Sequence, residues 1–544
     1  MKRICIQALH VAILMLIAST SASNAAQSKQ RLSVLLLTVD NLRPDRMSVY
    51  GYDKDTTPYL KKFSQEAVVF DRAFSTSAWT APGMVSIFTG YYPPVHAQHG
   101  RFSYYDDEMA SAFKVLAAEG YEILGQAIKG PSHQGFGFQK LLGKGPDRLE
   151  AFIEDRKDDF APFFAWAHIK DVHLPYNPSE RNAERFNANT RDTASIEAVK
   201  KHRVILRHPE LVNIDFEHAG KVEFEDEDVP VVRALYDAEV ADVDERLQRN
   251  LERMRETGLL DRTIVIISAD HGEELFDHGW LGHASTGYDA KLYDELIRIP
   301  LIIRVPHLST HGRFDALVQG VDFMPTIFEL LDIDATKVKP AMQGHSFLPV
   351  IRRETESIRN YVFTQTTLKG WTTPLDEMRK RIVSVRSDDK KLIWIPDGEK
   401  TSVEGYDLVR DPDELNNIYP GEAEQFRDLE EALESWIMDN RSRAASLVMN
   451  GAQQRINNIV EVLLRDNDLN KAVSSWTAIQ TMEETWGLEP EQFYQIEPYA
   501  AQWQNIQQTA AGMIGSAMTC AAKGGKLGTS EPTLPLTVEH WRCN

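Results

Sequence analysis

Two short apolar segments of this chain each end in a carboxylate. Residues Leu32–Asp40 read LSVLLLTVD and residues Thr263–Asp270 read TIVIISAD, and His271 follows the second Asp directly. Runs of this length, rich in Val, Ile and Leu, are typical of buried parallel strands, whose carboxyl ends form ligand sites in α/β sheets. Two carboxylates and an imidazole at one edge favour a divalent metal ion. We therefore predict Asp40, Asp270 and His271 as metal ligands; the alternative is that each Asp only caps the turn that follows.

A hydroxyl residue stands where a helix is expected to begin. In the segment SAWTAPGMVSIFTG, Thr80 precedes Ala81 and Pro82, and a short apolar run follows. A helix N-terminus carries partial positive charge, which favours an alkoxide or a bound anion. A hydroxyl that is coordinated to a divalent metal there becomes a nucleophile near neutral pH. Thr80 is thus a candidate nucleophile and a further metal ligand, or else only a helix cap.

The elements that must position these residues alternate along the chain. Apolar runs and amphipathic charged stretches follow one another through residues 32–419, the pattern of an α/β layer fold. Further strands are expected at Phe163–Lys170 and Pro300–Val305. A solvent-facing helix is expected within Val231–Gly258, because its charges alternate densely and it ends in Gly. Residues 191–228 are polar and are expected to form a long irregular insertion.

Length and composition bound the domain organisation. The chain has 544 residues, of which 42% are hydrophobic, enough for one large domain with an appendage. We expect a signal peptide over residues 1–26 and a catalytic α/β domain over residues 27–375. A small antiparallel α+β subdomain is expected over residues 376–438. Residues 439–544 are expected to form a helical extension in which we find no chemical motif.

The N-terminal residues have the features of a secretory signal peptide. Lys2 and Arg3 precede an apolar stretch from Val11 to Ala18, and small residues lead to an expected cleavage near Ala26. The apolar stretch is too short to cross a bilayer. A periplasmic or secreted protein with no integral membrane span after cleavage is therefore predicted.

The net charge excludes some classes of partner, and the cysteine content indicates which disulfide could form. The formal net charge is −20, which disfavours a nucleic-acid partner and an anionic lipid surface. An acidic protein that handles an anionic substrate must concentrate positive charge locally, and a bound metal does so. Beyond the expected signal peptide the cysteines are Cys520 and Cys543, which we expect to form one disulfide or to remain two free thiols.

Several motifs together resemble the sulfatase family of the alkaline-phosphatase-like superfamily. They extend over about residues 31–435 and read DNLRPDR at 40–46, TAPG leading to TG at 89–90, DVHLPY at 171–176, ADHGE at 269–273 with GH at 282–283, LYDE at 292–295 and YDL at 406–408. The resemblance implies a large, mostly parallel mixed sheet flanked by helices. It also implies an ester hydrolase whose substrate is an anionic ester, either a small molecule or one derived from polysaccharide or lipid.

One departure from the family pattern concerns the nucleophile. Classical sulfatases carry Cys or Ser, any residue, Pro, Ser and Arg, and that Cys or Ser is oxidised to formylglycine. Here the position falls on Thr80, and Ala-Pro-Gly-Met follows. Thr cannot give the aldehyde, and Ser77 is a poor substitute because Pro82 lies five residues beyond it instead of two. A GKWH-like segment is also missing near residues 125–129. Thr at this position resembles the superfamily's phosphoethanolamine and phosphoglycerol transferases, where it is both nucleophile and ligand.

The resemblance also implies roles for residues that are not among the predicted metal ligands. Asn41 would add a ligand oxygen or contact the substrate, and Arg101 would contact the substrate anion. His173 and His283 would bind substrate oxygens or protonate the leaving group, because imidazole titrates in the useful range. The implied cofactor is one divalent metal ion; a nitrogen ligand favours Zn or Mn, and Ca remains possible.

Three functions remain open from the sequence. The first is a metal-dependent hydrolase of sulfate or phosphate esters. The second is a transferase that passes the Thr-bound group to an alcohol. The third is a sulfatase-like binding protein without catalysis, suggested by the missing family residues.

Overall fold

The computed structural model describes most of the chain. The described residues are 31–99, 111–125, 138–142, 148–202, 204–206, 219–221, 223–283, 291–368, 370, 380–397, 400–461, 472–473, 499–523, 527–529 and 541–543. The expected signal peptide therefore lies outside them, as does Arg101. Among the described residues, no helix is long and apolar enough to span a membrane.

A nine-stranded mixed sheet forms the core, in the order β12-β2-β11-β8-β1-β5-β3-β4, with β13 paired to β2. Its strands are β1 (Ser33–Val39), β2 (Val68–Phe74), β3 (Glu122–Gly125), β4 (Lys140–Leu141), β5 (Phe163–Ile169), β8 (Thr263–Ala269), β11 (Arg298–Arg304), β12 (Gly312–Phe314) and β13 (Val318–Gln319). Strands β8, β1, β5, β3 and β4 run parallel, whereas β11 is antiparallel to both β8 and β2. The prediction of a mostly parallel mixed sheet is confirmed.

The register of the central strands brings the two strand-end acids together. All residues of β1 and β8 are buried, as their apolar composition requires. The two strands pair in parallel with Val39 opposite Ala269. Asp40 and Asp270 therefore follow at the same level on adjacent strands, at the carboxyl edge of the sheet.

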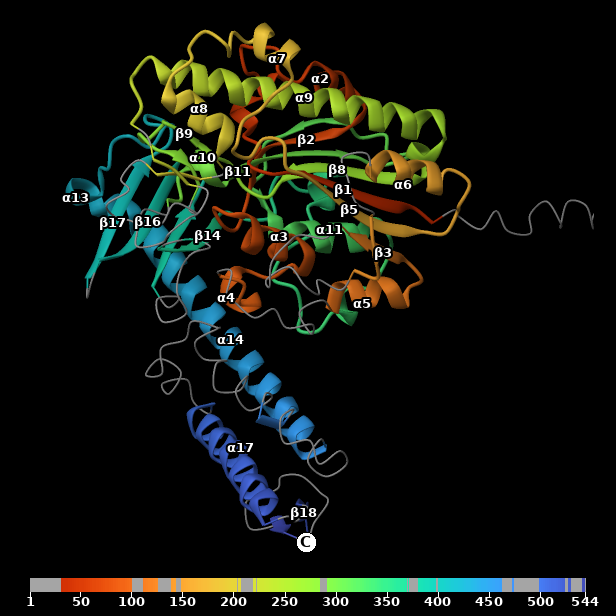
Figure 1. Cartoon of the computed structure of the whole chain (residues 1–544), viewed down its shortest axis with the longest axis vertical. Coiled ribbons are helices and arrows are strands. Elements are labelled where there is room, and N and C mark those ends of the chain that lie inside the picture. Colours follow the sequence, from red (N-terminus) through yellow and green to blue (C-terminus); the bar gives the residue numbers. More distant parts are fainter. Residues whose placement is uncertain are drawn as a thin grey trace, which may run out of the picture.

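Helices cover both faces of the sheet, so the fold has three layers (Figure 1). One face carries α2 (Pro58–Phe63), α6 (Arg148–Arg156), α7 (Glu180–Arg185), α8 (Ala194–Lys201) and α9 (Asp228–Glu256). The other face carries α3 (Thr80–Thr89), α4 (Pro93–His96), α5 (Ser111–Ala118) and α11 (Phe323–Leu330). Short helices α10 (Asp294–Ile297) and α12 (Leu348–Ile351) complete this domain.

Two local expectations need correction. The helix expected within Val231–Gly258 is α9, but it is not simply solvent-facing: a full face of it, including Val232, Leu235 and Leu247, is buried against the core. Its dense charge masks this apolar stripe in the sequence. The insertion at residues 191–228 is also partly regular, since it contains α8 and the short paired strands β6 (Val204–Leu206) and β7 (Ala219–Lys221).

A second, antiparallel sheet lies beside the core domain, in the order β14-β15-β16-β17. Its strands are β14 (Val362–Thr367), β15 (Arg381–Arg386), β16 (Lys390–Asp397) and β17 (Lys400–Asp407), followed by α13 (Tyr419–Glu422). The antiparallel character matches the expectation, and β14 extends the sheet upstream of residue 376. Beyond it, the long helix α14 (Arg427–Glu461) runs away from the body and packs against α17 (Tyr499–Ala522) (Figure 1).

The end of the chain is tied to α17. Cys520 is disulfide-bonded. Cys543 belongs to β19 (Trp541–Cys543), which pairs with β18 (Leu527–Thr529) and packs against α17. A Cys520–Cys543 bond fits this arrangement and stays a prediction.

A buried acid in α9 predicts how folding stability depends on pH. Asp244 accepts the backbone N–H groups of Tyr59 (2.8 Å) and Leu60 (2.9 Å) at the start of α2. Burial raises the pKa of Asp244 from 3.8 to about 7, and the charges of Asp55 and Glu245 add to the effect. The folded chain then holds this proton more tightly than the unfolded chain, so its contribution is fully present below pH 4 and is lost as pH rises to 7. The loss amounts to at most about 4 kcal/mol.

We expect the Asp244→Asn variant, which mimics the protonated acid, to lose less stability than the wild type between pH 5 and about pH 7.5. Urea unfolding at several pH values measures this difference. The exposed Asp261→Asn variant serves as the control and should follow the wild-type curve. Parallel curves for Asp244→Asn and wild type would contradict the assignment.

Candidate active site

The three predicted metal ligands meet at the carboxyl ends of β1 and β8. Asp40, Asp270 and His271 are each at most 3% exposed. The Nε2 atom of His271 lies 3.4 Å from Asp270 Oδ2 and 3.9 Å from Asp40 Oδ1. Their ligand atoms all lie within 4.8 Å of one another. The structure thus brings together the residues that the sequence pattern paired.

The histidine in this group is oriented as a ligand. Its Nδ1 atom lies 2.7 Å from the carbonyl oxygen of Gly272, which can only accept, so Nδ1 carries the proton. Its Nε2 lone pair then faces the two carboxylates. Burial, together with nearby His283, holds the pKa of His271 well below its ordinary value. A neutral imidazole whose other nitrogen donates to a carbonyl is the usual form of a metal-bound histidine.

The charges and the unpaired oxygens of this group fit a divalent cation. Burial and the adjacent charge of Asp40 raise the pKa of Asp270 well above its ordinary value. Burial opposes ionisation of Asp40 as well, but the imidazoles of His173, His168 and His271 hold its pKa well below the ordinary value. Asp270 Oδ2 and Asn41 Oδ1 are buried without a hydrogen bond from the described residues. Because unpaired buried oxygens are costly, these atoms suit ligation of a cation.

Thr80 is the first residue of α3 and contacts the group formed by Asp40, Asp270 and His271, called the metal group below. Its Oγ1 lies 3.3 Å from His271 Nε2 and 3.5 Å from Asp40 Oδ1. The N-cap residue of α3 is Trp79, whose side chain makes no capping hydrogen bond. Thr80 lies inside the helix and therefore does not act as its cap. Close packing of α3 depends on Gly83, because a Cβ there would lie 2.7 Å from the carbonyl oxygen of Asp270. Thr80 remains partly exposed and therefore open to a substrate.

Glu273 connects three of the polar groups around the metal group. It accepts a hydrogen bond from Asn41 Nδ2, and its Oε1 lies 2.8 Å from His283 Nδ1. The hydroxyl of Tyr176 donates to Oε2 at 3.3 Å. The main-chain N–H of Asn41 donates to Asp270 Oδ1 at 3.3 Å. Asn41 and His283 are therefore held in place beside Asp40 and Asp270.

His173 follows β5 and lies beside His283. Its ring packs edge-on against that of His283, with centroids 5.1 Å apart. Burial lowers the pKa of His173. Its Nδ1 lies 2.6 Å from the carbonyl oxygen of Leu174 and so carries the proton, which leaves Nε2 as an acceptor.

A polar cleft of about 810 Å³ adjoins His173. Its walls are built from the loop after β5, from α7 and from α9. Cationic and acidic groups are balanced along it: Lys170, Arg181, Arg246 and Arg249 against Asp171, Glu239, Asp242 and Glu245. Asn177 and Ser179 add uncharged polar groups. The cleft is suited to a hydrophilic group attached to the reacting ester.

The sequence analysis missed His168, which supports Asp40 from β5. Trp166 Nε1 donates to Thr38 Oγ1 at 2.9 Å, and Thr38 Oγ1 lies 2.8 Å from His168 Nδ1. Nε2 of His168 lies 3.4 Å from Asp40 Oδ2, a carboxylate oxygen that accepts, so Nε2 carries a proton and the Thr38 hydroxyl donates to Nδ1. The signal available was the position of His168 near the end of a strand expected to lie in the same sheet.

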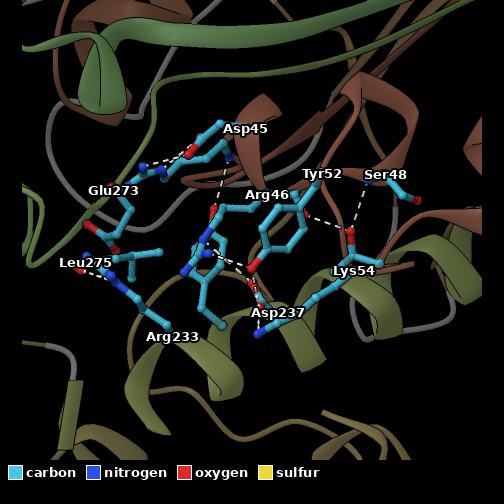
Figure 2. A network of polar contacts seen from close by, with 12 residues as sticks. Asp45, Arg46, Ser48, Tyr52, Lys54, Arg233, Asp237, Glu273 and Leu275 are labelled. Atoms are coloured by element: carbon cyan, nitrogen blue, oxygen red, sulfur yellow. Dashed lines mark hydrogen bonds and ion pairs between the residues drawn. The ribbon is translucent and has the colours of Figure 1, made fainter. Parts of the chain in front are cut away.

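The loop after β1 is braced by ion pairs. Arg43 is buried and pairs with Asp45 (2.8 Å) and Asp277 (2.5 Å), while its Nη1 also donates to the carbonyl oxygen of Glu273. Further along the loop, Arg46, Tyr52 and Lys54 converge on Asp237 of α9 (Figure 2). Asp40 and Asn41 are thus attached to a stiff loop, which limits how far the ligands can move.

Arg381, at the start of β15, is a cation that the sequence analysis did not select. It donates from Nη1 to His99 Nδ1, and His99 follows α4, which packs against α3. Burial lowers the pKa of Arg381 to about 9. Its Nη2 is buried without a hydrogen bond from the described residues. Arg381 therefore joins Arg101 as a candidate contact for an anion.

The contacts of Glu273 predict a catalytic effect separate from metal binding. In the Glu273→Gln variant an amide replaces the carboxylate that holds Asn41 and His283, so we expect kcat to fall about 10- to 100-fold. Metal content should remain that of the wild type, because no ligand is removed. The exposed Glu329→Gln variant is the control for loss of a glutamate charge. An unchanged kcat in Glu273→Gln would mean that Asn41 and His283 do not need this support.

Comparison with known proteins defines the class to which this fold and site belong. The sequence profile described as Sulfatase matches residues 33–147 and 146–333, and that described as N-sulphoglucosamine sulphohydrolase, C-terminal, matches residues 278–443. The chain belongs to the sulfatase family. It is an ester hydrolase of that family.

Individual relatives are distant. The chain is 25% identical to an N-acetylglucosamine-6-O-sulfatase of Bacteroides thetaiotaomicron, over 76% of this chain and 87% of the relative. It is 23% identical to arylsulfatase K of Xenopus laevis, over 73% and 80%. The structure of a phosphonate monoester hydrolase of Agrobacterium radiobacter superposes with a TM-score of 0.60 at 20% identity, over 76% and 96%. The last similarity shows the shared fold.

Proposed function

We propose that this protein is an exported, metal-dependent hydrolase that cleaves sulfate esters of a carbohydrate through Thr80. The observation that carries the proposal is the contact of the Thr80 hydroxyl with Asp40 and His271, both of which belong to the metal group. Asp40, Asp270, His271 and Thr80 would hold one Zn or Mn ion. When bound, such an ion lowers the pKa of a coordinated hydroxyl and neutralises negative charge on the ester.

In the proposed mechanism, the chain supplies the nucleophile and the proton transfers. Nε2 of His173 or His283 takes the proton of the Thr80 hydroxyl while Oγ1 attacks sulfur in line, so that an O–S bond forms while the bond to the leaving oxygen breaks. The imidazolium formed in this way gives the proton to the leaving oxygen. Water then attacks the sulfur of the Thr80 ester and loses a proton to the same imidazole, which passes it to Thr80 Oγ1 as hydrogen sulfate leaves, so that the hydroxyl is restored.

The cleft beside His173 supports a carbohydrate as the alcohol part of the ester. It is polar, charge-balanced and about 810 Å³ in volume, which is room for a sugar unit. Relatives of this chain are named for N-acetylglucosamine 6-sulfate and for ulvan. Arg181, Arg246 and the side chains of Asn177 and Ser179 offer donors for sugar hydroxyls.

A phosphonate or phosphodiester substrate is the second candidate. The hydroxyl nucleophile of Thr80 is suited to phosphorus as much as to sulfur, and the fold superposes on two phosphonate monoester hydrolases. Their TM-scores of 0.60 and 0.58 show a shared fold and leave the reacting ester to be measured.

Substrate preference and metal dependence can be measured in one experiment. The purified protein is stripped of metal, reloaded with Zn, Mn or Ca, and assayed with 4-nitrophenyl sulfate, bis(4-nitrophenyl) phosphate and a nitrophenyl phosphonate. We expect turnover only after reloading, with Zn or Mn above Ca and sulfate above phosphorus esters. Preference for a phosphorus ester would support the second candidate. Transfer of the group to an added alcohol, instead of water, would indicate a transferase.

A further inference from the structure

A second group of metal-ligand side chains lies outside the site described above. It consists of Glu274 in β9 (Glu274–Leu275), His278 in the turn between β9 and β10 (Leu281–Gly282), and Glu295 in α10. One ligand atom from each lies within 4.8 Å of the others. This group shares no residue with Asp40, Asp270 and His271.

Glu274 is the observation that points to a ligand. The residue is 2% exposed, and neither carboxyl oxygen has a hydrogen bond from the described residues. Burial, reinforced by the charge of Glu295, raises the pKa of Glu274 to about 8. A buried carboxyl group with two unsatisfied oxygens is costly to the fold unless a partner neutralises it.

His278 is oriented so that one nitrogen faces the carboxylates. Its Nε2 lies 3.1 Å from the carbonyl oxygen of Glu414, which can only accept, so Nε2 carries a proton. Its Nδ1 lies 2.5 Å from Glu295 Oε1. The ring is clamped by stacking on Tyr293, with centroids 3.7 Å apart and an interplanar angle of 12°. Nδ1 therefore donates to Glu295 in this structure, and once that proton is displaced its lone pair would face the carboxylates, as in a metal-bound histidine.

We propose that Glu274, His278 and Glu295 bind a second divalent cation. Two carboxylates balance its charge, and the mixed nitrogen and oxygen ligands favour Zn or Mn over Ca. The cation satisfies Glu274, whose two carboxyl oxygens receive no hydrogen bond from the part of the chain that the structure describes. Without it, the same three residues need a proton on both Glu274 and His278 to reach neutrality.

This cation has a structural role next to the active site. Across the β9–β10 pair, Glu274 lies opposite Gly282, the residue before His283. The N–H of Glu273 donates to the carbonyl oxygen of Glu295 at 3.1 Å. A cation shared by β9, its turn and α10 therefore ties together the segments that carry Glu273 and His283.

Metal stoichiometry tests the second site without reference to activity. The full protein is stripped of metal with a chelator, reloaded separately with Zn or Mn and passed through a desalting column. The number of metal ions per chain is then measured by inductively coupled plasma mass spectrometry. We expect two ions per wild-type chain, and one ion in Glu274→Gln, which preserves the shape of the side chain. The Asp270→Asn variant should also retain one ion, and the double variant none.

The outcomes separate this proposal from that of the catalytic metal. One ion in the wild type, together with none in Asp270→Asn, overturns the second site and leaves the first. Two ions in Glu274→Gln overturn it as well, whatever Asp270→Asn shows. A second readout is the thermal midpoint of the Asp270→Asn protein: added Zn or Mn should raise it, and adding Glu274→Gln to that variant should abolish the rise. No shift in the Asp270→Asn protein counts against the second site.

Discussion

The Thr80→Ala variant is expected to lose ester hydrolysis by at least about 1,000-fold in kcat. The hydroxyl that this change removes is the group that contacts both Asp40 and His271 and that remains partly exposed to substrate. The change leaves α3 intact, since Trp79 and not Thr80 is the N-cap residue and alanine favours helix. The rates are measured on metal-loaded protein with the preferred nitrophenyl ester.

Two matched variants make the Thr80 result specific. Thr80→Ser keeps the hydroxyl and should retain most of the rate. Ser77→Ala removes a hydroxyl three residues earlier, which is buried and outside the metal group, and should stay within a few-fold of wild type. If Thr80→Ala remains active while Ser77→Ala is inactive, the nucleophile assignment is wrong. Mass spectrometry of quenched wild-type protein should show a sulfuryl or phosphoryl group on the peptide that contains Thr80.

The Asp270→Asn variant is expected to bind its catalytic metal at least about 100-fold more weakly and to lose most activity at limiting metal. Asn retains the oxygen that accepts the N–H groups of Asn41 (3.3 Å) and His271 (3.0 Å), so the local backbone should persist. What it loses is the negative charge beside Asp40 that a cation would neutralise. Titration of metal-stripped protein, followed by activity, measures the effect.

Thermal stability supplies an independent check on the same variant. In the metal-free wild type, burial and Asp40 oppose ionisation of Asp270. Removing that acid should therefore raise the thermal midpoint of the metal-free protein while reducing the gain on adding Zn or Mn. His168→Gln, which removes the imidazole that faces Asp40 but no proposed ligand, should weaken metal binding by a smaller factor, about 10-fold. A variant less stable than wild type in both states would indicate that Asp270 is structural.

Several parts of the site follow from local sequence pattern. The runs that end at Asp40 and Asp270 are short and rich in Leu, Val and Ile, which specifies buried strands whose ends carry the acids. The helix beginning at Thr80 follows from Pro82 and the αL-forming Gly90. The antiparallel character of β15 and β16 also follows from their turn signals.

The sequence pattern was less informative where charged residues are buried. Dense charge suggested that the Val231–Gly258 helix faces solvent, yet α9 buries Asp237 and Asp244 along with its apolar residues. Both acids are satisfied by groups distant in sequence, Asp237 by Arg46 and Lys54. The order of residues along the chain does not reveal such partners.

The sequence by itself determined the strand-end acids, the hydroxyl at the helix start and the family, because each is encoded within a few consecutive residues. Only the tertiary structure decided that His168 supports Asp40, that Glu273 holds Asn41 and His283, and that Glu274 meets Glu295 across a hairpin and a short helix. These contacts join residues from separate elements. Their geometry depends on strand register and helix packing, which arise from burial of the whole core and not from local propensity.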